Sequence, residues 1–162
     1  MTEPPADILR RLRPIPTTSG PPTTAPRDVT GVDPDGHACT VDVLGGAAPV
    51  LLLFLSAGCT GCRDLWEGLD RLQVGLGEGY RLAVVTKSPG DEDPRSIAAL
   101  AGDAPERLGI PVVMSTPAYR DYRVSGPPFL VVADADAVRT EGVAWGMDET
   151  LRAARRALGD AS

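Results

Sequence analysis

The sequence predicts a single α/β domain in which a central mixed β-sheet is flanked by helices. Continuous apolar runs at 50–55, 82–86 and 129–133 are typical of strands buried on both faces of a sheet. Apolar residues recur at helical spacing elsewhere, most clearly over 65–76 and 147–158. A length of 162 residues fits one hydrophobic core. Alternating strands and helices of this kind indicate an α/β fold.

The N-terminal part differs from the rest in composition. Residues 1–27 are rich in proline and threonine, and such a segment cannot bury enough apolar surface to order itself. We therefore expect a flexible arm over 1–27 and one folded domain over 28–162. An inert tail is favoured over a docking element for the arm.

The first half of the domain begins with a predicted hairpin. The core starts near Val29, and the turn at 33–36 is followed by a loosely alternating strand at 38–44. The apolar strand at 50–55 comes next. A helix then follows and ends at the glycines of 75–79.

The second half has a clear helix start and a final antiparallel pair. Asp93 before Pro94 is typical of an N-cap followed by proline at the first helical position. The other expected elements are a strand at 82–86, an extended piece at 110–114, strands at 129–133 and 137–145, and an amphipathic helix over 147–158.

The segment Cys59-Thr60-Gly61-Cys62 joins the 50–55 strand to the following helix. Unpaired N–H groups at a helix start favour an anion, and a thiol placed there has a pKa below its ordinary value of about 8.5. We therefore assign Cys59 as the attacking thiolate. Cys62, about one turn further on, is expected to attack the mixed disulfide and release the reduced substrate. Arg63 and Asp64 add opposite charges beside the pair, so the sequence does not fix their net effect on the thiol pKa values.

Two other interpretations of the cysteines were weighed. A zinc site would need two more ligands, and His37 with Cys39 would complete the count, but their spacing is not that of a chelating pair. A purely structural disulfide is disfavoured because the small loop that it closes gives little stabilisation. We interpret Cys39 as a partly buried strand residue and His37 as a solvated turn residue.

Composition excludes several classes of function. A formal net charge of -6 and the lack of a Lys or Arg run argue against nucleic-acid binding. The apolar runs are too short for a transmembrane helix, and the acidic, proline-rich start does not resemble a signal peptide. We therefore expect a cytoplasmic protein, where a CxxC pair is catalytic more often than structural.

Two stretches carry a resemblance to a known family. They are Phe54-Leu55-Ser56-Ala57-Gly58-Cys59-Thr60-Gly61-Cys62 and Tyr122-Arg123-Val124-Ser125-Gly126-Pro127-Pro128-Phe129. With the order of elements, they make residues 29–159 similar to the thioredoxin-like fold, and most similar to its TlpA- and MauD-like thiol–disulfide oxidoreductases. The predicted hairpin and the longer insert between Thr86 and Tyr122 also fit that branch. The resemblance implies a cis peptide bond at Pro128, facing the CxxC pair.

The sequence departs from that family at four positions. The tryptophan that usually precedes the first cysteine is replaced by Gly58, which leaves Cys59 more open. The buried acid of the preceding strand corresponds to Leu53, and an acid of the next loop to Lys87, whose charge would stabilise a thiolate. Pro127, before the predicted cis-proline, has no N–H to bond an extended substrate, so we expect a narrower range of substrates.

These observations lead to one functional hypothesis. The chain is expected to be a thiol–disulfide oxidoreductase, acting as a disulfide reductase, with Cys59 as nucleophile and Cys62 as resolving residue. The expected substrate-contacting residues are Gly58, Thr60, Gly61, Pro127 and Pro128. No metal and no cofactor beyond the dithiol is expected. The partners would be a protein thiol or disulfide and an electron-donor dithiol protein, with the chain itself a monomer.

Three alternatives remain open. A non-catalytic thioredoxin-like binding module is the stronger rival, because Gly58, Leu53 and Pro127 all depart from an active pattern. A peroxiredoxin-like peroxidase is disfavoured because Ser56-Ala57-Gly58 lacks the Pro and Thr expected before its cysteine. The third alternative is a metal carrier or zinc protein.

Overall fold

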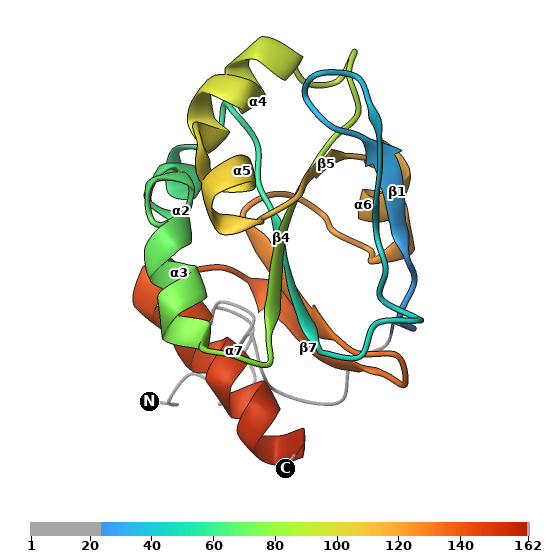
Figure 1. Ribbon diagram of the computed structural model, residues 1–162, viewed down its shortest axis with the longest axis vertical. Helices are drawn as coiled ribbons and strands as arrows, with labels where there is room; N and C mark the ends of the chain where they lie inside the picture. The colour runs from blue at the N-terminus through green and yellow to red at the C-terminus, as the bar shows by residue number, and fades with distance from the viewer. Residues whose placement is uncertain (1–23, 162) are drawn as a thin grey trace, which may run out of the picture.

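The computed structural model describes residues 24–161 and shows one mixed seven-stranded sheet with helices on both faces (Figure 1). The strand order is β2-β1-β5-β4-β3-β6-β7. The strands are β1 (Val29–Val32), β2 (Ala38–Val41), β3 (Val50–Phe54), β4 (Arg81–Thr86), β5 (Val112–Met114), β6 (Phe129–Ala133) and β7 (Val138–Val143). The helices are the 3-10 turn η1 (Thr60–Cys62), α2 (Arg63–Glu67), α3 (Leu69–Leu76), α4 (Pro94–Ala101), α5 (Ala104–Leu108), α6 (Thr116–Asp121) and α7 (Met147–Ala161).

The centre of the sheet is made by the strands that the apolar runs predicted. β3 pairs parallel with β4 and antiparallel with β6, and all five of its residues are buried. The predicted N-terminal hairpin is confirmed, since β1 and β2 pair antiparallel and β1 also pairs with β5. The predicted strand at 38–44 is shorter than expected, because Val43 and Leu44 donate their N–H groups to Asp28 instead of extending the ladder.

Two apolar clusters fill the space on the two faces of the sheet. Helices α2, α3, α4, α5 and α7 cover one face, and α6 lies on the other (Figure 1). One cluster contains Cys62 with residues of those five helices, and the other contains residues of α6 with β1 and β2. β3 contributes to both clusters, because successive side chains of a strand point to opposite faces. The CxxC segment therefore lies at the end of the most deeply buried strand.

The helix after the CxxC segment is interrupted, where the sequence predicted one continuous helix. α2 ends at Gly68 and α3 begins at Leu69. A Cβ at Gly68 would overlap the terminal methyl of Met147, at the start of α7. Glycine at this position therefore leaves room for the end of the Met147 side chain to pack on the junction.

The insert between β4 and β6 contains two short helices that the sequence analysis missed. α5 ends at Gly109 in the left-handed conformation (φ 67°), and the Ser115 hydroxyl caps α6 by accepting from the Ala118 N–H (3.3 Å). α4 begins as predicted, with the Asp93 carboxylate accepting from the Arg95 N–H (3.1 Å).

The predicted N-terminal arm, residues 1–27, lies mostly outside the described residues, and its boundary stays a prediction. At its end, the Thr24 hydroxyl donates to Glu141 (2.7 Å) and the Arg27 N–H donates to the Tyr122 hydroxyl (2.8 Å). Residues 24–27 are thus bonded to β7 and to the C-terminal end of α6.

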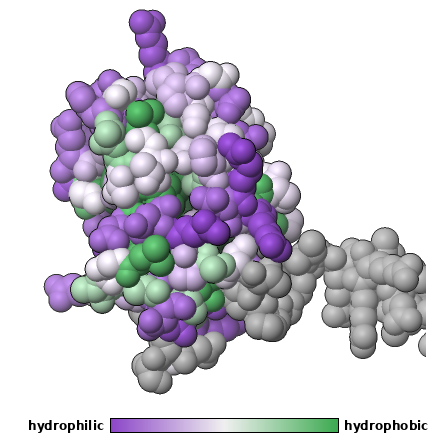
Figure 2. Space-filling model, turned by 90° about the vertical axis from the view of Figure 1, so that its right-hand side faces the viewer, coloured by the Kyte–Doolittle hydropathy of each residue, from purple (hydrophilic) through white to green (hydrophobic). Residues whose placement is uncertain are grey.

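The surface of the described part carries few large apolar side chains. Those that are well exposed are Leu44, Val74 and Trp145. On the face seen in Figure 2, hydrophobic side chains occur in separate places among hydrophilic ones. Within residues 24–161, none of the helices combines the length and the apolar character that crossing a bilayer requires.

Candidate active site

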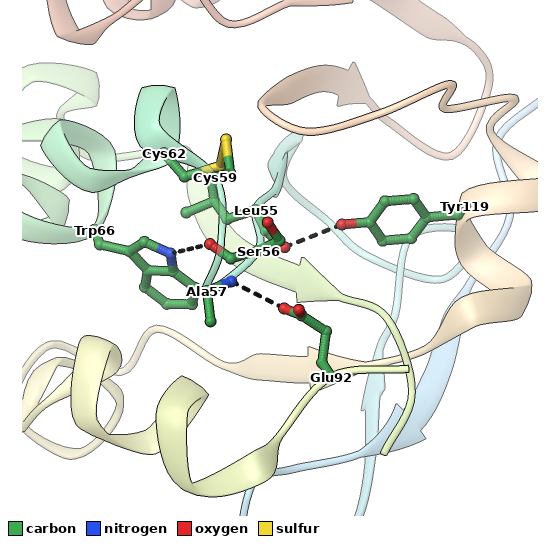
Figure 3. Close-up of a disulfide and its surroundings, with 8 residues drawn as sticks. All are labelled: Leu55, Ser56, Ala57, Cys59, Cys62, Trp66, Glu92 and Tyr119. Carbon is green, nitrogen blue, oxygen red and sulfur yellow. Dashed lines mark hydrogen bonds between the residues drawn. A yellow bond between two sulfur atoms is a disulfide. The ribbon is translucent and has the colours of Figure 1, made fainter. Parts of the chain in front are cut away.

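Cys59 and Cys62 form a disulfide at the start of the helix that follows β3 (Figure 3). Cys59 occupies the N-cap position of η1, and the Cys62 N–H donates to the Cys59 carbonyl (3.2 Å). The sequence placed the helix start here, although a single 3-10 turn precedes α2. Local geometry thus holds the two sulfur atoms together at a strand-to-helix junction.

The two cysteines differ in exposure. Cys62 is fully buried in the apolar cluster that also contains Leu53 and Leu65. Cys59 is half-buried and lines a hollow at the surface. A substrate can therefore reach the Cys59 sulfur, whereas Cys62 is reached through Cys59.

The predicted cis bond is present between Pro127 and Pro128, directly before β6. Pro128 packs against the CxxC segment, since a Cβ at Gly61 would lie 3.6 Å from its ring carbons. The Pro128 carbonyl accepts from the Ala144 N–H (3.1 Å). The structure thus brings Gly61 and Pro128 together, while the substrate-contacting roles of Gly58, Thr60, Gly61, Pro127 and Pro128 stay predictions.

The three residues between β3 and Gly58 are held by side chains from three separate elements (Figure 3). The Tyr119 hydroxyl of α6 donates to the Leu55 carbonyl (3.0 Å). The Trp66 indole N–H of α2 donates to the Ser56 carbonyl (3.1 Å). The Ala57 N–H donates to the Glu92 carboxylate (2.9 Å), which comes from the loop before α4.

Sequence patterns pointed to neither Tyr119 nor Glu92 as a partner of this segment. The family resemblance places Lys87 at the acid position after the second central strand, but the carboxylate that bonds the segment before the CxxC pair belongs to Glu92, five positions later. The loop 88–92 delivers it, since the Glu92 N–H donates to the Ser88 carbonyl (3.1 Å) and Asp91 accepts from Thr116 (2.6 Å). No sequence pattern marks this position, because the loop conformation alone determines which side chain turns inward.

Lys87 lies beside Tyr119 instead. Its ammonium group is 5.6 Å from the centroid of the Tyr119 ring, a cation–π geometry. Burial raises the pKa of Tyr119, and the nearby charge of Glu92 raises it further. Tyr119 therefore stays protonated and keeps donating to Leu55 at ordinary pH. The proposed effect of Lys87 on the cysteine thiolates stays a prediction.

The structure does not assemble the zinc site that was weighed from sequence. Among the described residues, the group of possible ligands that lies close together is Asp33, Asp35 and His37, in the exposed turn between β1 and β2. Cys39 is a half-buried free thiol on β2, as expected, and its pKa is raised by burial and then by the charge of Asp33.

Comparisons with known proteins support the fold. No family model matches the chain, and no curated protein matches it in sequence. Solved structures do resemble it. The thioredoxin domain of a thiol-disulfide oxidoreductase from Bacteroides vulgatus has 18% identity, covers 86% of this chain and 98% of its own, and gives a TM-score of 0.63.

Two further structures give the same result. A thiol:disulfide interchange protein of the thioredoxin family from Chlorobium tepidum has 21% identity, with coverage of 87% of this chain and 99% of its own, and a TM-score of 0.60. A secreted disulfide oxidoreductase from Mycobacterium tuberculosis, homologous to E. coli DsbE, has 16% identity, coverage of 78% and 94%, and a TM-score of 0.58. The chain therefore has a thioredoxin-like fold, with a CxxC pair at the helix N-terminus.

Proposed function

We propose that the protein is a thiol–disulfide oxidoreductase that acts by dithiol–disulfide exchange at Cys59 and Cys62. The observation that carries this proposal is the placement of an accessible and a buried cysteine in one CxxC pair, packed beside the cis-Pro128 bond. The structural neighbours described as thiol–disulfide oxidoreductases or interchange proteins support it.

The exchange follows from the difference in exposure. In the reduced protein, the Cys59 thiolate attacks one sulfur of a substrate disulfide, forms a mixed disulfide and releases one substrate thiol. The Cys62 thiolate then attacks the Cys59 sulfur, forms the internal disulfide and releases the second thiol. Two electrons pass to the substrate, and a donor dithiol protein restores the reduced pair.

The direction of exchange is proposed to be reductive, in a cytoplasmic setting, as the sequence predicted. Protein thiols or disulfides are the proposed partners. Gly58, Thr60, Gly61, Pro127 and Pro128 are proposed to contact them, and Pro127 contributes only a carbonyl to an extended peptide because it has no N–H.

A redox titration of the pair, combined with insulin reduction, tests the proposal. Both are done in a Cys39→Ser background, so that the remaining thiols belong to the CxxC pair. A potential near about -270 mV supports a reductant, and one near about -120 mV an oxidant. A pair that titrates but never turns over insulin or any other disulfide would leave the non-catalytic binding module as the better interpretation.

A further inference from the structure

A hollow lies beside Cys59, on the side that α4 borders. It has a volume of about 300 Å³ and is lined by Ala57, Gly58, Cys59, Thr60, Arg63, Trp66 and Leu100. Small-molecule sites begin at about this size and combine an apolar wall with few polar groups. Trp66 and Leu100 supply the apolar wall here. The hollow therefore has room for a small substrate next to the sulfur atom that a substrate can reach.

The charge of this hollow is positive. Among the described residues, Arg63 is the charged side chain of its lining. The Arg63 backbone N–H donates to the Thr60 carbonyl, but its side chain is exposed and makes no hydrogen bond or ion pair within the described part of the chain. Two carboxylates are close in sequence or space, but Asp64 does not line the hollow and Glu92 accepts from Ala57. Arg63 is thus available to an incoming anion.

The part of the site at Gly61 and Pro128, which do not line the hollow, is less suited to a peptide. Pro128 packs on Gly61, and Pro127 has no N–H to pair with an extended backbone. We propose, on the basis of the proposed exchange function, that the Arg63 hollow binds low-molecular-weight disulfides that carry a carboxylate. The carboxylate pairs with Arg63, and one substrate sulfur is held beside Cys59.

The reaction needs no further component. The Cys59 thiolate attacks the bound disulfide, one half leaves as a thiolate, and the other half stays as a mixed disulfide in the hollow. Cys62 then attacks the Cys59 sulfur and releases the second half. The protein dithiol is oxidised to the internal disulfide, and the small disulfide is reduced to two thiols.

Three disulfides of similar size but different charge test the proposal. They are 3,3′-dithiodipropionate, bis(2-hydroxyethyl) disulfide and cystamine, which are anionic, neutral and cationic. Each oxidises the reduced Cys39→Ser protein, and its rate is divided by its rate with free 2-mercaptoethanol. The net charge of -6 disfavours anions in general. After division by the rate with 2-mercaptoethanol, the anionic disulfide is expected to react faster than the neutral one, and added salt should reduce this preference. Because the net charge works against anions, we attribute such a preference to Arg63.

Arg63→Gln is expected to lower the anionic-to-neutral rate ratio by about two- to fivefold, the effect of one exposed ion pair. The neutral disulfide corrects for any change in the reactivity of Cys59. Arg71→Gln, which removes an exposed charge from α3, should leave the ratio unchanged. An equal ratio in the wild type and Arg63→Gln overturns the proposal.

A second pair of variants tests the hollow without changing Arg63. Leu100→Glu places a carboxylate in its wall and should also lower the ratio, whereas Ala99→Glu adds the same charge to an exposed position of α4 outside the hollow. A ratio lowered equally by both variants contradicts a local site.

Two further outcomes separate the possible failures. A peptide disulfide with glutamate beside its cysteine distinguishes an acidic peptide from a small molecule. If only the peptide depends on Arg63, the small-molecule proposal is wrong. If even the neutral disulfide oxidises the pair no faster than it oxidises the Cys59→Ser variant, the exchange function fails as well.

Discussion

The segment before the disulfide and the segment that contains it are built in opposite ways. In residues 55–57, successive backbone groups are bonded by Tyr119, Trp66 and Glu92. In residues 58–61, the structure shows no side-chain hydrogen bond, and the space around a Cβ at Gly58 is empty. Residues 55–57, which lead to Cys59, are thus fixed by hydrogen bonds, while residues 58–61, which we call the front of the site, are open.

This difference shows how Cys59 can be held in a fixed position and still be accessible to a substrate. β3 ends at Phe54, and although the Leu55 N–H still donates to the Val85 carbonyl (3.0 Å), the backbone groups that follow need other partners. Side chains from α2, α6 and the loop before α4 provide them. The sulfur that they position then faces a hollow at the surface instead of a packed wall.

The largest expected effect comes from the two cysteines. Cys62→Ser should abolish turnover and accumulate a mixed disulfide, because Cys59 is accessible and the resolving thiol is gone. Cys59→Ser should also abolish turnover but accumulate no adduct, since Cys62 is fully buried. Intact-protein mass spectrometry after incubation with a substrate disulfide measures both. Equal adduct formation by the two variants would show that the Cys59 and Cys62 sulfur atoms are equally accessible to substrate, and would contradict the prediction.

Glu92→Ala should give the next largest effect, a decrease in the free energy of unfolding, because it removes a hydrogen bond that fixes residues 55–57. It leaves the Ala57 N–H without its partner; because this hydrogen bond is only part-buried, the expected cost is in the lower part of the range of about 1–3 kcal/mol. Glu92→Gln keeps an accepting oxygen and should recover most of this. Denaturant unfolding of the oxidised protein gives the free energies. Glu106→Ala, an exposed acid on α5, is the control, and a loss no greater than that of the control would contradict a positioning role for Glu92.

Tyr119→Phe should destabilise the protein by about 0.5–1.5 kcal/mol at pH 8, the net value of one hydrogen bond to Leu55. The difference in free energy of unfolding between the wild type and Tyr119→Phe should become smaller above about pH 10, where tyrosine in the unfolded chain ionises. Burial raises the pKa of Tyr119, so the folded state keeps its proton longer than the unfolded state. The stability that this group contributes is therefore lost as pH rises through that range.

Unfolding at pH 8 to 11 measures this prediction, and absorbance at 295 nm follows the tyrosines directly. All three have a raised pKa through burial, with that of Tyr80 raised to about 12. The folded protein should show little ionisation at pH 10. A wild-type titration like that of free tyrosine would contradict the buried environment of Tyr119.

Sequence patterns predicted the elements that are long or strongly apolar. β3, β4 and β6 follow from continuous apolar runs, and α4 follows from Asp93 before Pro94, because each pattern has a local physical cause. α5 and α6 were missed because five or six residues are too few to show a helical period. The cis bond at Pro128 was predicted from family resemblance alone, since cis X-Pro bonds are uncommon.

The site was predictable only where it is local in sequence. The CxxC pair and its position after β3 are adjacent, so their relation could be predicted from the chain. Glu92 and Tyr119 reach the same segment from 35 and 64 positions away, through a loop and a short helix. Trp66 was the one partner with a local signal, since it lies one helical turn after Cys62.

Gly58→Ala should have the smallest effect on stability, and it tests whether the surroundings of residues 58–61 are open. No heavy atom lies within 4 Å of a Cβ at this position, and the backbone is outside the left-handed region. Alanine should therefore raise the free energy of unfolding by about 0.4–1 kcal/mol, by reducing the freedom of the unfolded chain. Gly31→Ala is the reference for a packed glycine, because its Cβ would overlap the Met114 backbone oxygen and should destabilise the protein. Denaturant unfolding compares the two. A loss of stability in Gly58→Ala as large as in Gly31→Ala would mean that the surroundings of Gly58 are packed. The distinction between the bonded segment 55–57 and the open segment 58–61 would then fail.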